Sequence, residues 1–255
     1  MSPLTVAFLA LGCIFGGSLL GMVLRPLLPE HHLSNESKDA VKLGTGMIAT
    51  LAALVLGLLI GSAKGTFDTM NNELKQTGSK VMLLDRVMAQ YGPETGEARD
   101  FLRSSVASAL QRIWPEETNT VAIAKIRQSS GDSVEVLQDK LRQLSPQNDA
   151  QRWLQSQALQ LSADIAGARA LLSEQAGQTS LPIPFLVVLV LWLIIIFASF
   201  GMFSTRNATV IIAFFVCALS VAGSLYLILE LDQPYQGLIK ISSAPLRNAL
   251  THLGQ

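Results

Sequence analysis

A run of 21 residues without a charged side chain, Leu43 to Ala63, most constrains the fold of this chain. As an α-helix at 1.5 Å per residue the run is about 31 Å long, which matches a bilayer hydrocarbon core of about 30 Å. Three further runs also lack Asp, Glu, Lys and Arg, namely Leu4 to Leu24, Phe185 to Phe203 and Ala208 to Leu229. One central charge in such a run would cost about 2.5 to 3.5 kcal/mol on insertion. The sequence therefore predicts four membrane-spanning helices.

We expect the first run to be a span and not a cleaved signal peptide. No Lys or Arg precedes it, and it is longer than a signal core.

The helical period of the second run continues beyond its charge-free part. Apolar residues recur mostly at intervals of three and four, with charged and amide side chains between them. They are Phe67, Met70, Leu74, Val81, Leu84, Met88 and Tyr91. We therefore expect one helix that leaves the bilayer at Lys64, has possible bending points at Gly65 and Gly78, and ends at Gly92-Pro93.

The segment after Pro93 carries further helical patterns. Apolar stripes run from Phe101 to Ile113, from Val134 to Leu144 and from Leu154 to Leu172, while Val121 to Ile126 is less regular. Trp114-Pro115 and Ser145-Pro146 end the first two stripes. Four or five amphipathic helices can bury a modest core, and a larger one if they also pack on copies of the chain.

These patterns predict an all-α integral membrane protein with four transmembrane helices and a helical cytosolic segment between helices two and three. The expected parts are residues 1–63 (spans one and two), 64–182 (the cytosolic segment), 183–229 (spans three and four) and 230–255 (an interfacial tail helix). The short turn Ser204 to Asn207 makes spans three and four an antiparallel hairpin. After Pro234, Ser242 or Ser243 can cap the tail helix, which we expect on the membrane or on the cytosolic core.

Charge orients the chain only weakly. Four spans place both termini and residues 64–182 on one side of the membrane. That side carries Lys64, Lys75, Lys80, Lys240 and Arg247 near the span ends, and the other side carries Arg25, Lys38, Lys42 and Arg206. Five basic residues on one side against four on the other give only a weak orientation bias under the positive-inside rule. The absence of cysteine from residues 64–182 favours the cytoplasm for that segment.

Several function classes find no support in the chain. It has no nucleotide-binding glycine pattern, CxxC, HExxH or nucleophile elbow, and no ionisable acid or base within the spans, so we expect no enzyme and no cofactor. The adjacent His31 and His32 would diverge and lack partner ligands, so we expect no metal, although a pH-sensing role stays open. A formal net charge of zero favours neither nucleic acid nor an anionic surface as a partner.

Small residues form ridges on the first two spans. The first span carries two glycine pairs spaced by four residues, Gly12 with Gly16 and Gly17 with Gly21. The second span carries Ala49, Ala53, Gly57 and Gly61 at successive intervals of four. Such ridges let neighbouring helices approach closely. Helix packing is the commoner use, and a pore lined by small residues is the alternative.

Several stretches together resemble the bacterial bestrophin-like domain proteins, over nearly the whole chain. They are Leu33-Ser34-Asn35-Glu36-Ser37-Lys38-Asp39 before Lys42-Leu43-Gly44-Thr45-Gly46, Leu54 to Ile60, Phe200-Gly201-Met202-Phe203 with Arg206-Asn207-Ala208-Thr209, and Glu230-Leu231-Asp232-Gln233-Pro234-Tyr235 with Gly237-Leu238-Ile239 and Ser242 to Arg247. The Glu-Leu-Asp-x-Pro-Tyr-x-Gly ending is the most specific part.

The resemblance implies an ion channel of the bacterial inner membrane, because bestrophins are pentameric channels with four membrane helices and a helical cytosolic part. The expected partners are the lipid bilayer, further copies of the chain in a symmetric oligomer, with a pentamer implied by the resemblance, and inorganic ions. The aromatic-rich neck of bestrophins has no counterpart in the second span, where Met47, Leu51, Leu54 and Leu58 are the candidates facing inward.

We therefore hypothesise a homo-oligomeric channel whose pore is lined by the second span and gated at an apolar constriction formed by these four residues. Lys42, Lys64, Glu230 and Asp232 are candidate charges at the pore mouths. The rival hypothesis is a non-conducting membrane scaffold or stress sensor whose cytosolic helices bind another protein. A polar stripe along one span would favour the channel, and the second span offers only Thr45, Thr50 and Ser62.

Overall fold

The computed structural model describes residues 2–27, 35–115, 134–177, 183–235 and 237–254. These residues form helices and no strand, so the described chain is all-α. The helices are α1 (Pro3–Leu24), α2 (Asn35–Tyr91), α3 (Gly96–Ile113), α5 (Val134–Arg142), α6 (Asp149–Gly177), α7 (Ile183–Phe203), α8 (Ala208–Leu231) and α9 (Ala244–His252), with short 3-10 helices η1 (Arg25–Leu27) and η3 (Pro93–Thr95). His31, His32 and Val121 to Ile126 lie outside the described residues.

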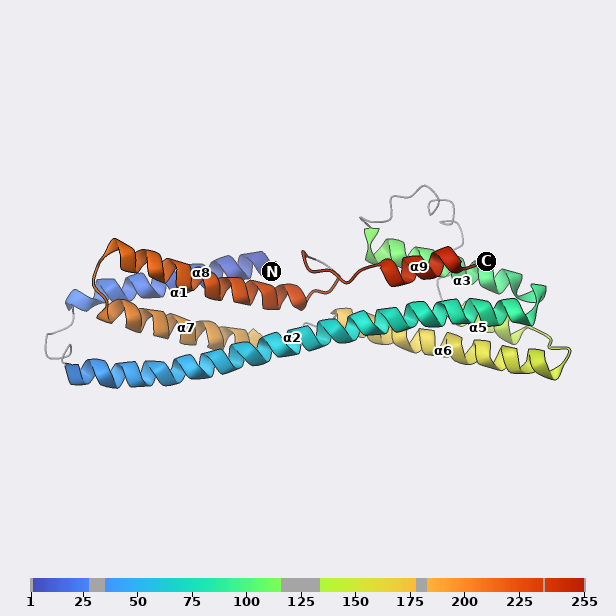
Figure 1. The fold of residues 1–255 in the computed structure, drawn as a ribbon, viewed down its shortest axis with the longest axis horizontal. Helices are drawn as coiled ribbons and strands as arrows, with labels where there is room; N and C mark the ends of the chain where they lie inside the picture. Colours follow the sequence, from blue (N-terminus) through green and yellow to red (C-terminus); the bar gives the residue numbers. More distant parts are fainter. Residues whose placement is uncertain (1, 28–34, 116–133, 178–182, 236, 255) are drawn as a thin grey trace. The chain divides into compact units, whose positions relative to one another are not determined.

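Four of these helices are long and apolar enough to cross a membrane, as predicted. They are α1, α7, α8 and the apolar part of α2. The chain divides into two compact units (Figure 1). The first unit comprises Met1–Phe67 and Thr179–Ile239 and contains all four apolar stretches, and the second comprises Asp68–Gln178 and Lys240–Gln255.

The long helix predicted from the second span is present. α2 runs without interruption past Gly65 and Gly78. It ends where expected, because Gly92 adopts a φ of 137° that other residues rarely tolerate and Pro93 begins η3. Gly78 serves close packing, since a Cβ there would press on the carbonyl of Pro245 at the start of α9.

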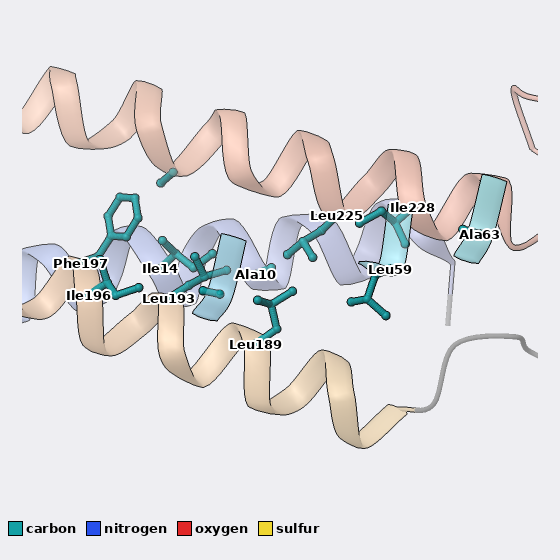
Figure 2. Close-up of a cluster of buried hydrophobic side chains, with 12 residues drawn as sticks. Ala10, Ile14, Leu59, Ala63, Leu189, Leu193, Ile196, Phe197, Leu225 and Ile228 are labelled. Atoms are coloured by element: carbon teal, nitrogen blue, oxygen red, sulfur yellow. The ribbon is translucent and has the colours of Figure 1, made fainter. Parts of the chain in front are cut away.

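The core of the first unit gathers side chains from all four apolar helices. Figure 2 shows Ile14 of α1, Leu59 of α2, Leu193 of α7 and Leu225 of α8 within one cluster. Ile14 and Leu225 are fully buried, although the helices around them also expose many apolar side chains. In water that exposure would be costly, but it suits helices whose outer surface meets lipid.

Glycines bring α1 and α7 into close contact. A Cβ at Gly21 would overlap the carbonyl of Ala198, and a Cβ at Gly201 would overlap the carbonyl of Ser18. Gly17 packs on Ile194, whereas nothing lies within 4 Å of a Cβ at Gly12 or Gly16. One of the two glycine pairs of the first span therefore packs within the chain, and it packs on α7.

The second unit contains α3, α5, α6, α9 and the last part of α2. Its most buried ion pair joins Asp85 of α2 to Arg99 of α3 through bonds of 2.7 and 3.0 Å, and the hydrogen bond to Asp85 raises the pKa of Arg99. The backbone N–H of Gly254 donates to the same carboxylate at 3.3 Å. Trp114 donates from Nε1 to the Ile241 carbonyl at 2.9 Å. The tail therefore packs on this helical unit.

α5 ends two residues earlier than its apolar stripe. Its last turn stops at Arg142, and Gln155 of α6 donates from Nε2 to the carbonyls of Leu141 and Leu144 at 2.8 and 3.0 Å. A side chain from a helix that follows in sequence thus satisfies carbonyls left open at this helix end, and the periodicity could not reveal it.

The substitution Gly21→Ala tests the α1–α7 contact. The added methyl group has to push the Ala198 backbone away, so we expect a loss of about 1–3 kcal/mol and a lower Tm in detergent. Gly12→Ala is the matched control on the same helix, since its Cβ meets open space and alanine favours helix by up to about 1 kcal/mol. Equal Tm values for the two variants would contradict the close contact.

Candidate pore-lining face and span ends

The four candidate constriction residues lie on one exposed face of α2. Met47, Leu51, Leu54 and Leu58 recur at intervals of four, three and four, and 49 to 70 % of each residue is exposed in the chain. Ala52, Leu59 and Ala63, on the other side of the helix, are buried in the core of the first unit. The second span is therefore apolar on both sides, and only one side has partners among the described residues of this chain.

The hydroxyl side chains of the second span do not form a polar stripe. Thr45 is buried, on the side of α2 that carries Ala52. Thr50 is exposed next to Met47, but its Oγ1 donates to the Gly46 carbonyl of its own helix at 2.9 Å. Ser62 is exposed near the end of the apolar part. A path along this face would thus be bordered mainly by methyl and methylene groups.

Lys42 and Lys64 flank the apolar part of α2 without lying on the exposed apolar face. At 100° per residue, Lys42 is about 140° around the helix from Met47, and Lys64 is about 120° from Leu58. Lys42 lies 3.6 Å from Asp39 in an exposed ion pair, and the Lys64 ammonium lies 5.7 Å from the centre of the Phe67 ring. Their long side chains reach the helix ends, so their charge acts at the mouths of any passage along this face.

The small-residue ridge of α2 is mostly open. Ala49 is half-buried against the core, whereas Ala53, Gly57 and Gly61 are exposed. Nothing in the described chain lies within 4 Å of a Cβ at Gly57 or Gly61. Packing on this ridge remains a prediction, and its partner would have to be a second copy or another protein.

Glu230 is engaged inside the first unit. Only 4 % of the residue is exposed; its Oε1 accepts from the Tyr226 hydroxyl at 2.6 Å, and its Oε2 accepts from the backbone N–H of Leu238 at 3.0 Å. Gly237, with a φ of 93°, lies so close that a Cβ there would overlap the carboxylate. Asp232, the C-cap residue of α8, is half-buried. Sequence reasoning missed that the acid and the glycine of the Glu-Leu-Asp-x-Pro-Tyr-x-Gly ending contact each other, because they are seven residues apart.

Among the described residues no group of three or more His, Cys, Asp and Glu side chains could hold a metal ion. Cys13 and Cys217 are free thiols on exposed faces of α1 and α8. The described site thus consists of an apolar helix face, flanking lysines and a hydrogen-bonded turn.

Comparison with known proteins agrees with this architecture. The family described as Bestrophin-like domain matches residues 12–246, which is most of the chain and includes the first span from Gly12 onward and the other three spans in full. The chain belongs to the bestrophin-like family. The match begins in α1 and ends in α9, so for this bestrophin-like chain the family region covers most of both units.

Solved structures show the same fold for the bestrophin-like chain. Crystal structures of a bacterial bestrophin homologue from Klebsiella pneumoniae align over nearly the full length of both chains. Two point mutants match with TM-scores of 0.69 and 0.66, at 14 and 15 % identity, and cover 100 and 97 % of this chain and 99 % of theirs. A third structure has a TM-score of 0.64 at 13 % identity and covers 94 % of this chain and 96 % of that one. No curated protein matches the chain.

The substitution Gly237→Ala tests the turn that Glu230 holds. A positive φ and the overlap with the carboxylate should cost at least about 1–3 kcal/mol, so we expect a lower Tm and weaker protection of the Leu238 amide in hydrogen exchange. Gly223→Ala, at an open position of α8, is the control. If Leu238 exchanged at the same rate in both variants, the contact between Glu230 and this turn would be wrong.

Proposed function

We propose that the protein is a homo-oligomeric ion channel of the bacterial inner membrane whose pore is lined by the exposed face of α2. The observation that supports this most directly is the stripe of Met47, Leu51, Leu54 and Leu58, which is open in the chain and lies opposite the side of α2 packed on α1, α7 and α8. The bestrophin-like family and fold, which are those of ion channels, support the same assignment.

Three surroundings are available to an exposed apolar stripe in a membrane, namely lipid, another helix or a pore. α1, α7 and α8 all contribute to the core on one side of α2, so in a ring of subunits their outer faces meet lipid and α2 is free to face the axis. Copies of the stripe around an axis form a narrow apolar passage. Such a passage excludes ions by dewetting until it widens, which supplies a gate without any ionisable group.

The ridge of Ala53, Gly57 and Gly61 supplies a contact between neighbouring subunits. Ala53 and Gly57 lie beside the stripe, with Gly57 about 100° around the helix from Leu58, so a neighbour on these two residues leaves the stripe uncovered. A contact between two different surface patches closes into a ring when the rotation between subunits allows. The resemblance to bestrophins implies five subunits.

Charges at the two ends of the passage bias which ions approach. Lys42 and Lys64 flank the apolar part of α2, and both termini and the second unit lie in the cytoplasm in this proposal. Glu230 and Asp232 remain candidate mouth charges. Because the Glu230 carboxylate is engaged by Tyr226 and Leu238, its effect on ions would act mainly through the position of the turn that carries Asp232.

A second candidate is the non-conducting scaffold or sensor, and one exposed residue favours it. Trp153 on α6 is 63 % exposed in the second unit, and a tryptophan in that position is typical of a protein contact. The absence of a polar stripe along the described part of the second span is compatible with this candidate too.

Widening the constriction tests the channel. Leu51→Ala with Leu54→Ala removes four methyl and two methine carbons per subunit from the stripe, so we expect at least about tenfold faster ion flux into liposomes, because a wider apolar passage stays wet. Leu191→Ala with Ile195→Ala, an exposed apolar pair on α7, is the matched control and should leave flux unchanged. Flux at background in the α2 variant would refute a pore along this face.

Enlarging the ridge tests self-association. Gly57→Leu places a bulky side chain where a neighbouring helix would have to approach, so we expect native mass spectrometry to find fewer complete oligomers than for the wild type. Gly12→Leu, an equally open glycine of α1, serves as the control. A monomeric wild type, or an oligomer that conducts neither cations nor anions, would shift support to the scaffold.

A further inference from the structure

We propose that Arg25 and Arg206 form a binding site for the phosphate group of an anionic lipid, at the end of the spans where α1 meets the turn between α7 and α8. The site lies wholly in the first unit and does not depend on whether the protein conducts ions.

A proline at the end of α1 creates half of this site. In a continuing helix the Met22 carbonyl would accept a hydrogen bond from the N–H of residue 26, but Pro26 has none. Arg206 replaces that donor, because its Nε and Nη2 donate to the Met22 carbonyl at 3.2 and 2.8 Å. A guanidinium from the α7–α8 turn is thus held at the end of α1 by an otherwise open carbonyl.

Arg25 makes the reciprocal contact. It lies at the C-cap of α1, and its Nη1 donates to the Ser204 carbonyl at 2.5 Å. Met22 and Arg25 lie on one helical turn, and Ser204 and Arg206 are two residues apart in the other segment. The crossed bonds therefore hold both guanidinium groups at the junction between the end of α1 and the α7–α8 turn.

The two guanidinium groups together offer positive charge and open hydrogen-bond donors to an anion. No carboxylate pairs with Arg25 or Arg206 among the residues that the structure describes. Each guanidinium has five N–H donors, and the carbonyl bonds use only one in Arg25 and two in Arg206. A planar guanidinium can donate two parallel hydrogen bonds to two oxygens of one phosphate group. Basic groups at a span end are known to bind lipid head groups.

The apolar surface around the pair favours a lipid over a free phosphate ion. Leu27 is 74 % exposed two residues after Arg25, Leu24 is exposed directly before it, and Phe200 is exposed one turn before Ser204. These side chains offer contact area to acyl chains next to the head group. An inorganic phosphate ion would gain nothing from them.

The test uses the full-length protein in detergent and measures lipid binding by native mass spectrometry and by the rise in Tm. Phosphatidylglycerol should bind at least about tenfold more tightly than phosphatidylcholine and raise Tm further, since its phosphate charge is not offset, whereas the choline ammonium of phosphatidylcholine is repelled by the two guanidinium groups. In Arg25→Gln with Arg206→Gln this preference should disappear. Lys38→Gln with Lys42→Gln removes the same charge from the start of α2 and should retain it.

Arg206→Lys covers the case in which the double variant does not fold. The lysine keeps the charge and one bond to the Met22 carbonyl but loses the fork, so we expect weaker phosphatidylglycerol binding at an unchanged Tm without lipid. An unchanged preference for phosphatidylglycerol in the foldable arginine variants would overturn the site. Equal stabilisation by inorganic phosphate and by phosphatidylglycerol would overturn its assignment to a lipid.

Discussion

Inside a hydrocarbon core no water is available to a backbone amide or carbonyl, so each span has to satisfy its own polar groups. This constraint explains why four stretches are charge-free helices and why their junctions are the chemically specific places. Where Pro26 leaves the Met22 carbonyl without its helical donor, a guanidinium from another element supplies one. Where α8 ends, Glu230 binds the N–H of the returning chain. The spans are apolar in their middle, and hydrogen bonds hold their ends.

Without a hydrophobic force between helices in lipid, close packing determines which spans touch. Gly17 and Gly21 of α1 and Gly201 of α7 allow backbone atoms to meet directly, while Gly57 and Gly61 of α2 meet nothing in the chain. Glycine therefore allows close packing between α1 and α7, whereas these two glycines of α2 have no contact in the described chain. The exposed stripe from Met47 to Leu58 adds to the part of α2 that has no partner among the described residues.

Much of the fold could be predicted from sequence because its signals are local. The spans follow from runs without charge, and the end of α2 follows from Gly92 and Pro93, whose backbone preferences act at once on their neighbours. α5 ends at Arg142, two residues before the end of its apolar stripe, and Gln155 of a different helix binds the Leu141 and Leu144 carbonyls, a contact that periodicity does not encode. The pairing of α1 with α7 could not be predicted from the four glycines in α1. Gly21 and Gly12 look alike in sequence, and only the fold shows that the first contacts α7 and the second does not.

The candidate site was less predictable for a related reason. The spacing of Met47, Leu51, Leu54 and Leu58 indicated one face of a helix, but a span is apolar on every face, so periodicity could not tell the core side from the open side. Glu230 and Asp232 seemed equivalent as mouth charges until the fold brought Tyr226 and the Leu238 amide to the first of them. Likewise a formal net charge of zero concealed a pair of arginines that the fold concentrates at one place.

The composition of the exposed α2 face favours the proposed channel over the scaffold. A helix that evolved only to pack on a partner gains from small residues along the whole contact, as the ridge with Gly57 shows. The stripe beside it instead carries Met and three Leu residues, which are too large for close backbone approach and too apolar to hold water in a narrow space. Large apolar side chains next to a small-residue ridge suit a ring in which the ridge holds the neighbour and the stripe projects into the opening. In that arrangement widening the ring by a small rotation of α2 changes the hydration of the passage without breaking any polar contact in the spans.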